Sequence, residues 1–122
     1  MKTTLYQIIL QSAKKACELQ SETGAMPAGH NGLYKDKETP VRNTSHWLIT
    51  FIKAYGIQAD PVLKNAAKKA LFYLMSQDAR PQKYTFWHRD VPGKDKCNGM
   101  MGQARTIEAL VEAALFIDEE SP

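Results

Sequence analysis

Hydrophobic residues recur at three- and four-residue steps along much of the chain. Between Thr3 and Ser21 they stand at positions 5, 8, 9, 13, 16 and 19. This spacing places side chains on one face of a helix. The pattern therefore predicts an amphipathic helix over residues 3–21.

A second run of this kind predicts a helix through Leu48, Phe51, Ile52 and Tyr55. Asn43, Thr44 and Ser45 precede it, and their short polar side chains commonly cap a helix N-terminus. Gly56 is typical of a helix end. We therefore expect this helix to open at residues 43–45 and to close at Gly56.

The start of a third helix is marked by Asp60 and Pro61. The carboxylate accepts from free amides of the first turn, and proline has no amide to leave unsatisfied there. A fourth periodic run, residues 107–117, follows Gly99 and leads into the acidic residues 118–120. Because carboxylates are unfavourable beside the negative end of a helix, we expect them to fray its last turn.

The lengths of the connections predict how the helices are arranged. Only residues 57–59 separate the second and third helices, so these should be antiparallel neighbours. Residues 22–42 and 77–98 form much longer connections, which an up-down-up-down path places at the same end. The N-termini of the second and fourth helices point into that region, and their free amides favour an anion or an oxygen-rich ligand.

A weak internal repeat supports this arrangement. Each half of the sequence contains a helix, a long loop, an asparagine and a second helix, with Asn43 and Asn98 in corresponding places. Two copies of a helical hairpin suit a stacked or closed array. The sequence thus predicts an all-α fold of antiparallel helical hairpins, with residues 1–122 forming one domain.

Composition narrows the classes of protein. The 16 basic and 13 acidic residues are interspersed, without the basic stripe and interleaved aromatics of a nucleic-acid binder. Cys17 and Cys97 form no CxxC pair, which favours reduced thiols over a disulfide framework. No segment has the pattern of a signal peptide or a membrane span. We expect a cytoplasmic protein that binds neither nucleic acid nor membrane.

The first long loop concentrates groups that recognise polar ligands. In the functional interpretation, cationic side chains hold the ligand, an aromatic ring stacks on it and a carboxylate transfers protons. In the structural alternative, the charges are solvated, residues 43–45 cap a helix and Trp47 fills the core. The functional candidates are Arg42 and His46 for holding, Trp47 or Tyr34 for stacking, Asp36 or Glu38 for proton transfer, and His30 as a further contact.

The second long loop carries a shorter set of candidates. Residues 84–90 alternate like an extended segment, in which Trp87, His88 and Arg89 would line a pocket. The alternative is a flap packed by Phe86 and Trp87 with His88 exposed. Further along, Cys97 is either a zinc ligand or nucleophile or a small buried residue.

Two stretches resemble a known superfamily. Residues 40–49 read PVRNTSHWLI and residues 97–110 read CNGMMGQARTIEAL. Both are similar to segments of α/α-toroid proteins of the six-hairpin glycosidase-like superfamily, and the resemblance covers most of the chain from Pro27 onward. In that superfamily a ring of helical hairpins holds a sugar site in a funnel at one end. The resemblance implies that the second and fourth helices are inner and that the loop end is the funnel.

The sequence departs from this superfamily in two ways. A complete toroid has a dozen helices, whereas this sequence predicts about four, so the resemblance implies a fragment, a truncated gene product or an unusual partial ring. We expect its helices to expose apolar flanks and therefore to associate or to be unstable. Arg105 stands where we expect an aromatic residue in the superfamily's motif, so a stacking ring is missing there.

A second toroid family gives an alternative. Residues 97–102, CNGMMG, are similar to the C-x-G-x-x-G segment of lanthionine-cyclase-like proteins, in which the cysteine binds zinc. The second motif of that family, a cysteine followed by histidine, is absent from this sequence.

The leading hypothesis is a partial carbohydrate-active α/α toroid, of glycoside hydrolase or sugar epimerase type, with a saccharide bound at the loop end. It predicts no metal and no cofactor, and it allows partnership with further copies or with the remainder of a larger toroid. The alternatives are a non-enzymatic helical interaction module and a zinc-dependent lanthionine-cyclase-like protein. The catalytic candidates are Asp36, His46 and His88, and the binding candidates are His30, Tyr34, Arg42, Trp47, Trp87, Arg89, Asn98 and Gln103.

Overall fold

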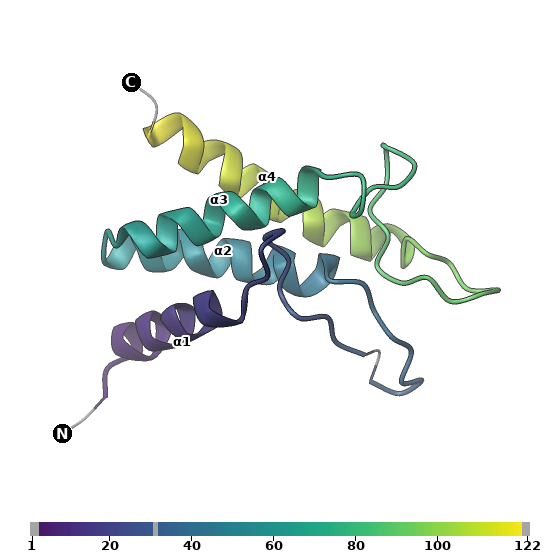
Figure 1. The fold of residues 1–122 in the computed structure, drawn as a ribbon, viewed down its shortest axis with the longest axis horizontal. Helices are drawn as coiled ribbons and strands as arrows, with labels where there is room; N and C mark the ends of the chain where they lie inside the picture. The colour runs from purple at the N-terminus through teal and green to yellow at the C-terminus, as the bar shows by residue number, and fades with distance from the viewer. Residues whose placement is uncertain (1–2, 31, 121–122) are drawn as a thin grey trace.

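The computed structural model describes residues 3–30 and 32–120. The described residues form four helices. Figure 1 shows that they run in alternating directions, with both long connections at one end and the short turn at the other. Within the described residues the structure has no β-strand, only the isolated β-bridges His30–Lys37 and Glu38–Arg89. The all-α prediction is confirmed. The helices are α1 (Leu5–Leu19), α2 (Val41–Ile57), α3 (Pro61–Met75) and α4 (Gly99–Glu120).

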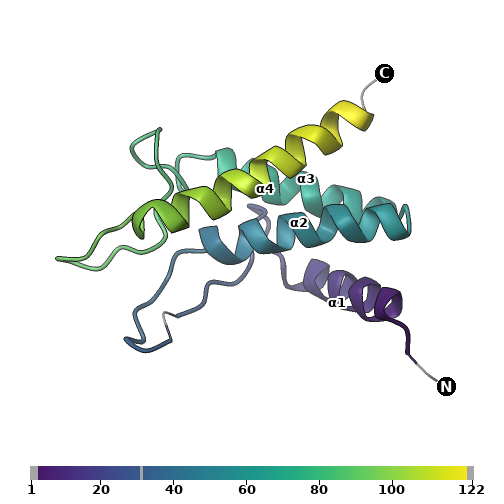
Figure 2. The ribbon, with the colours of Figure 1, turned by 180° about the vertical axis from the view of Figure 1, so that it is seen from behind.

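Helix α2 is the centre of the structure. It contacts α1, α3 and α4, whereas the described residues of α1 and α4 make no contact with each other. Figures 1 and 2 show α1 and α4 on opposite sides of α2, with α2 and α4 running in the same direction. The N-termini of α2 and α4 therefore lie at the end that carries both long loops.

The core consists of small residues facing a few large ones. Alanines of α1, α3 and α4 are almost fully buried, and small side chains allow helix axes to approach closely. Tyr55 of α2 and Phe116 of α4 pack edge to face with 5.5 Å between ring centroids. Burial of these apolar surfaces is the main stabilising contribution. The largest fully buried apolar side chains are Phe51, Met26, Leu48, Leu63, Leu74 and Val41.

The predicted start of α3 is confirmed. Pro61 is its first residue, and the Asp60 carboxylate accepts a hydrogen bond from the Val62 amide at 2.9 Å. Helix α1 begins with a capping box that pairs Thr4 with Gln7. Helix α4 extends through the acidic residues to Glu120, beyond the periodic run that ended at Ile117.

The predicted caps of α2 are wrong. The helix begins at Val41 after Pro40, so Asn43, Thr44 and Ser45 lie inside its first turns. Asn43 Nδ2 donates to the Pro27 carbonyl at 2.8 Å, and Thr44 Oγ1 accepts from the Met26 amide at 2.9 Å. These side chains fasten the first loop onto α2, which is why they are unavailable as caps.

No helix in the described part of the chain combines the length and the apolar character that crossing a membrane requires.

Candidate functional site

The two long loops meet at the end of the helices where they were predicted to converge. The Thr39 amide donates to the His88 carbonyl at 2.9 Å, and Glu38 and Arg89 form an antiparallel bridge. The Asp36 carboxylate pairs with Lys94 and lies 3.9 Å from Arg89 Nη1. Residues more than forty positions apart are thus fixed against one another.

A cavity of about 80 Å³ lies between these loops and the N-termini of α2 and α4. A chamber of about 300 Å³ adjoins it and shares Arg42, His88 and Asn98 as lining residues. The larger space is at the lower end of the range for small-molecule sites. The cavity is completed by Glu38 and Arg89, and the chamber by His46, Met101, Gly102 and Arg105.

The sequence of α2 explains why two of these side chains face the same space. Arg42 and His46 are four residues apart, so they lie on one face of the helix. Arg42 Nη2 pairs with Glu38 Oε1 at 2.8 Å. The loop before the helix is therefore linked to the helix at the edge of the site.

Two neighbouring residues have different roles at the start of α4: Asp95 caps the helix, and Asn98 lines the cavity. Asn98 adopts a left-handed backbone with φ of 55°, a conformation that asparagine tolerates better than most residues. The Asp95 carboxylate accepts from the amides of Gly99 at 2.6 Å and Cys97 at 3.0 Å. These two hydrogen bonds lower the pKa of Asp95, that of Gly99 most. Asp95 therefore caps α4 and leaves the Asn98 side chain to line the cavity.

His88 is almost completely buried, with 3% of its surface exposed. Its Nε2 lies 2.9 Å from the Gly102 carbonyl oxygen, which can only accept, so Nε2 carries the proton. Its Nδ1 is then an acceptor, and it is buried without a hydrogen-bond partner. Burial lowers the pKa of His88; the Gly102 hydrogen bond opposes this, and the nearby Arg42 and His46 lower it further. The alternative with an exposed His88 is wrong.

Glu38 supplies a second acceptor without a partner. Its Oε1 is held by Arg42, whereas Oε2 is buried and unpaired. The sequence analysis named Asp36 or Glu38 for proton transfer and listed Asp36 among the catalytic candidates. In the structure Glu38 lines the cavity, while the Asp36 carboxylate faces Lys94 and Arg89. The four-residue spacing of Glu38 and Arg42 is a signal in the sequence that could have pointed to Glu38.

The structure brings together Arg42, His46, His88, Arg89 and Asn98, and it adds Arg105, which the sequence analysis did not select.

Five other predicted binding residues lie outside the cavity and the chamber. His30 is exposed and bridges to Lys37. A lysine ammonium lies over each of the rings of Tyr34 and Trp87, with Lys94 Nζ at 4.9 Å and Lys96 Nζ at 4.2 Å from the respective centroids. Gln103 contacts the second loop, and Trp47 lies between α1 and α2.

The Gln103 side chain holds the second loop against α4. Its amide accepts from the Phe86 amide and donates to the carbonyls of Phe86 and Cys97, each at 2.9 Å. Both hydrogens of its amide nitrogen, and its amide oxygen, are thus engaged inside the protein. Gln103 therefore shapes the wall behind the site.

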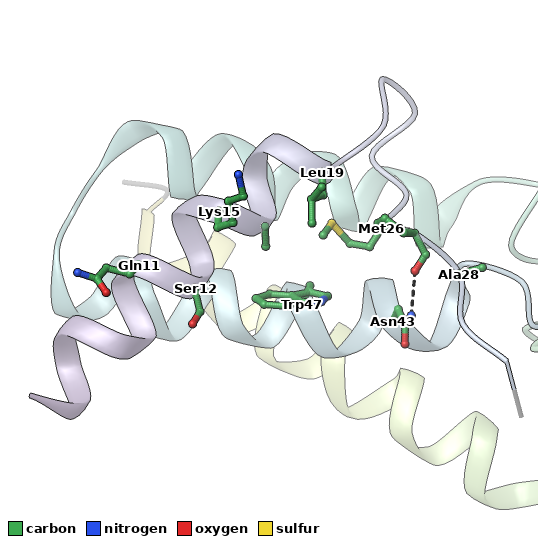
Figure 3. A pocket seen from close by; sticks show the side chains of 10 residues that line it. Gln11, Ser12, Lys15, Leu19, Met26, Ala28, Asn43 and Trp47 are labelled. Atoms are coloured by element: carbon green, nitrogen blue, oxygen red, sulfur yellow. Dashed lines mark hydrogen bonds between the residues drawn. The ribbon is translucent and has the colours of Figure 1, made fainter. Parts of the chain in front are cut away.

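Trp47 lies in a separate groove of about 620 Å³ between α1 and α2. Figure 3 shows its indole between the two helices, with Ser12 and Lys15 on the α1 side and Met26 on the loop. Its ring packs against Phe51 with 6.0 Å between centroids. Because α1 and α4 flank α2 on opposite sides, this groove opens away from the chamber.

Both cysteines are free thiols and half-buried. Within residues 3–30 and 32–120, no three His, Cys, Asp or Glu side chains gather closely enough to hold a metal ion.

Comparison with known proteins gives one informative similarity. No family model matches the sequence, and no solved structure matches it. The chain is 52% identical over 118 residues to the Archaeal glycosylation protein Q of Haloferax volcanii. The match includes 97% of this chain and 32% of the relative. The chain thus spans about a third of the length of the curated relative that it matches.

Proposed function

We propose that this chain is part of a carbohydrate-active α/α-toroid protein with a role in glycosylation, and that it binds a saccharide in the chamber at the loop end. The observation that carries the proposal is the buried pair of unpaired acceptors, His88 Nδ1 and Glu38 Oε2, beside the donors Arg42 and Asn98. Sugar hydroxyls both donate and accept, so they match such a mixed lining. The name of the relative from Haloferax volcanii supports the same class of ligand.

The arrangement of helices supports the toroid. In a ring of hairpins, inner helices are parallel neighbours and so are outer ones. Here α2 contacts α4 and runs parallel to it, and α1 contacts α3 in the same way. Since α1 and α4 do not touch, the four helices form an open arc. A relative three times as long has room for the rest of such a ring.

The lining also bears on the type of reaction. A glycosidase of the usual kind needs two carboxyl groups, about 5–10 Å apart, around the bond that is cleaved. Among the described residues only Glu38 contributes a carboxylate to the cavity or the chamber. Two histidines, His46 and His88, line the chamber and can exchange protons with a sugar. We therefore favour sugar epimerisation over hydrolysis as the activity to which this site contributes.

Binding is tested by titrating the protein with the methyl glycosides of glucose, galactose, mannose and xylose, using calorimetry and amide NMR shifts. Arg105→Met keeps an apolar stem while removing a guanidinium from the chamber wall, and we expect at least a five-fold weaker dissociation constant, about 1 kcal/mol. Lys68→Ala, on the exposed face of α3, is the control. Equal binding by wild type and Arg105→Met, or no binding at all, would contradict the proposal.

The type of reaction has a separate test. Incubation of the free sugars in D₂O detects epimerisation as deuterium incorporated at carbon, whereas hydrolysis releases methanol from the methyl glycosides. Methanol release without deuterium incorporation would show that epimerisation is the wrong choice.

A second candidate function, protein association, rests on the exposed apolar face of α4. Met100, Ile107, Val111 and Leu115 lie on one side of this helix and are 90%, 52%, 54% and 57% exposed. An apolar stripe of this kind marks an interaction surface. It favours association with a second copy or with another helical hairpin. Light scattering over a hundred-fold concentration range tests self-association, and we expect Val111→Glu to abolish it; a wild type that is monomeric throughout would exclude the second-copy form.

A further inference from the structure

The cavity between Glu38 and His88 contains two hydrogen-bonding groups that the protein itself leaves unused. A buried polar atom without a partner costs free energy, so each such atom calls for an explanation. His88 Nδ1 and Glu38 Oε2 are both of this kind, and both residues line the same space of about 80 Å³. The shared location indicates that one ligand feature satisfies both.

The chemistry of the two atoms specifies what that feature must do. His88 Nε2 is already committed to the Gly102 carbonyl, so Nδ1 can only accept. Glu38 Oε1 is committed to Arg42, and Oε2 as a carboxylate oxygen can also only accept. The ligand must therefore donate two hydrogen bonds.

Other ligand groups are unsuitable for this cavity. A carboxylate or a phosphate presents mainly acceptors, which would face two further acceptors. An ammonium group donates, but Arg42 and Arg89 on the same wall repel it. A hydroxyl donates one hydrogen and can accept from a guanidinium or from the Asn98 amide at the same time. Two hydroxyls therefore match the two acceptors and also the donors beside them.

The volume of the cavity is also consistent with two hydroxyl groups. A water molecule occupies roughly 30 Å³ in the liquid, so the space of about 80 Å³ holds between two and three groups of that size. Two neighbouring hydroxyls on one edge of a sugar ring fill it, and the ring itself then lies in the adjoining chamber of about 300 Å³.

We propose that this cavity is a subsite for a vicinal diol, in which one hydroxyl donates to His88 Nδ1 and its neighbour donates to Glu38 Oε2. The inference rests on the proposed saccharide binding and makes it specific: the protein selects sugars by a pair of adjacent hydroxyls. Arg42 and Asn98 stand on the same wall as donors to the two oxygens.

The test uses whichever methyl glycoside of the panel binds best, together with its monodeoxy and monofluoro analogues. Removal of a hydroxyl that donates to a buried acceptor should weaken binding roughly 5- to 150-fold. Fluorine accepts but does not donate, so the fluoro analogues should lose as much as the deoxy analogues. We expect these losses at two adjacent ring positions and at no other pair.

A variant assigns one of the positions. Glu38→Gln keeps the shape of the side chain but replaces one acceptor oxygen by a donor, so one of the two deoxy penalties should disappear while the other remains. Glu112→Gln, at the Lys53 pair away from the chamber, is the matched control. Circular dichroism melting checks that both variants fold, and the analogue series on the wild type decides the matter if Glu38→Gln does not.

The outcomes separate the two proposals. If no saccharide binds, saccharide binding and the diol subsite both fall. If a saccharide binds but the sensitive positions are not adjacent, or fluorine restores the affinity, the diol subsite is overturned while saccharide binding stands. Unchanged penalties in Glu38→Gln would also overturn it.

Discussion

Gly24 is the position at which the first loop touches the backbone of α3. Its φ is +93°, and a Cβ atom there would lie 1.8 Å from the Lys69 carbonyl oxygen and 2.4 Å from the carbonyl carbon. The contact is reinforced by Gln20, whose side-chain amide donates to the carbonyls of Gly24 and Ala66, each at 3.0 Å. There is therefore no room for a side chain, and the opposing atoms belong to a helix backbone.

Gly24→Ala should lower the free energy of unfolding through two effects. A left-handed backbone costs an alanine about 1–2 kcal/mol. Relief of the clash moves the loop away from α3, which breaks hydrogen bonds worth about 0.5–1.5 kcal/mol each. The same movement exposes part of the buried Met26, whose full burial is worth about 1.5–3 kcal/mol. We expect a total loss of about 3–6 kcal/mol, a large share of the stability of a small domain.

The measurement is urea unfolding followed by circular dichroism at 222 nm, with Gly93→Ala as the matched control. Gly93 has a φ of +79° but nothing within 4 Å of an added Cβ, so its variant shows only the backbone effect of about 1–2 kcal/mol. Gly24→Ala should therefore lose at least about 2 kcal/mol more than Gly93→Ala. Equal losses in the two variants would refute the steric explanation.

Two further predictions concern the site. His88 has a lowered pKa in the folded protein, so the unfolded chain binds its proton first; stability should fall as the pH drops below about 6.5, and His88→Gln should reduce this slope in urea midpoints measured from pH 7.5 to 5. Gly102→Ala places a Cβ 2.7 Å from the Cys97 carbonyl oxygen and 3.0 Å from the His88 ring. It should displace the imidazole and weaken methyl glycoside binding at least ten-fold by calorimetry, whereas unchanged affinity would show that the ring is not in contact with the ligand.

The helix starts show which parts of the fold can be predicted from sequence. Asp60 and Pro61 act within one turn, so their pattern is local and the predicted start of α3 was right. Thr44 obeys the same capping statistics, yet its hydroxyl accepts from the Met26 amide, eighteen residues earlier. A pattern rule contains no information about that distant partner, which is why the start of α2 was misplaced.

The site also has features that the sequence predicts and features that depend on long-range contacts. The position of the loops followed from chain direction and connection length, and it needed no knowledge of side chains. The choice between Asp36 and Glu38 depends on how the loops pair: the bridge between Glu38 and Arg89 sets the register that places Glu38 on the cavity. Likewise, the burial of His88 depends on its hydrogen bond to Gly102, fourteen residues away in the sequence. These are long-range contacts, and a single sequence does not specify them.

The energetics of these two residues favour a binding role over a structural one. A histidine kept in the core only for packing would be replaced at little cost by an apolar side chain, and a glutamate kept only to pair with Arg42 would lie at the surface. Instead, each has one atom used inside the protein and one buried atom without a partner, and both residues line the same small cavity. Most buried polar atoms in a fold are paired internally, so two unpaired acceptors on residues that share one cavity call for an explanation. The unpaired acceptors are therefore best explained by a partner that the protein binds, and the adjoining chamber gives that partner a place to lie.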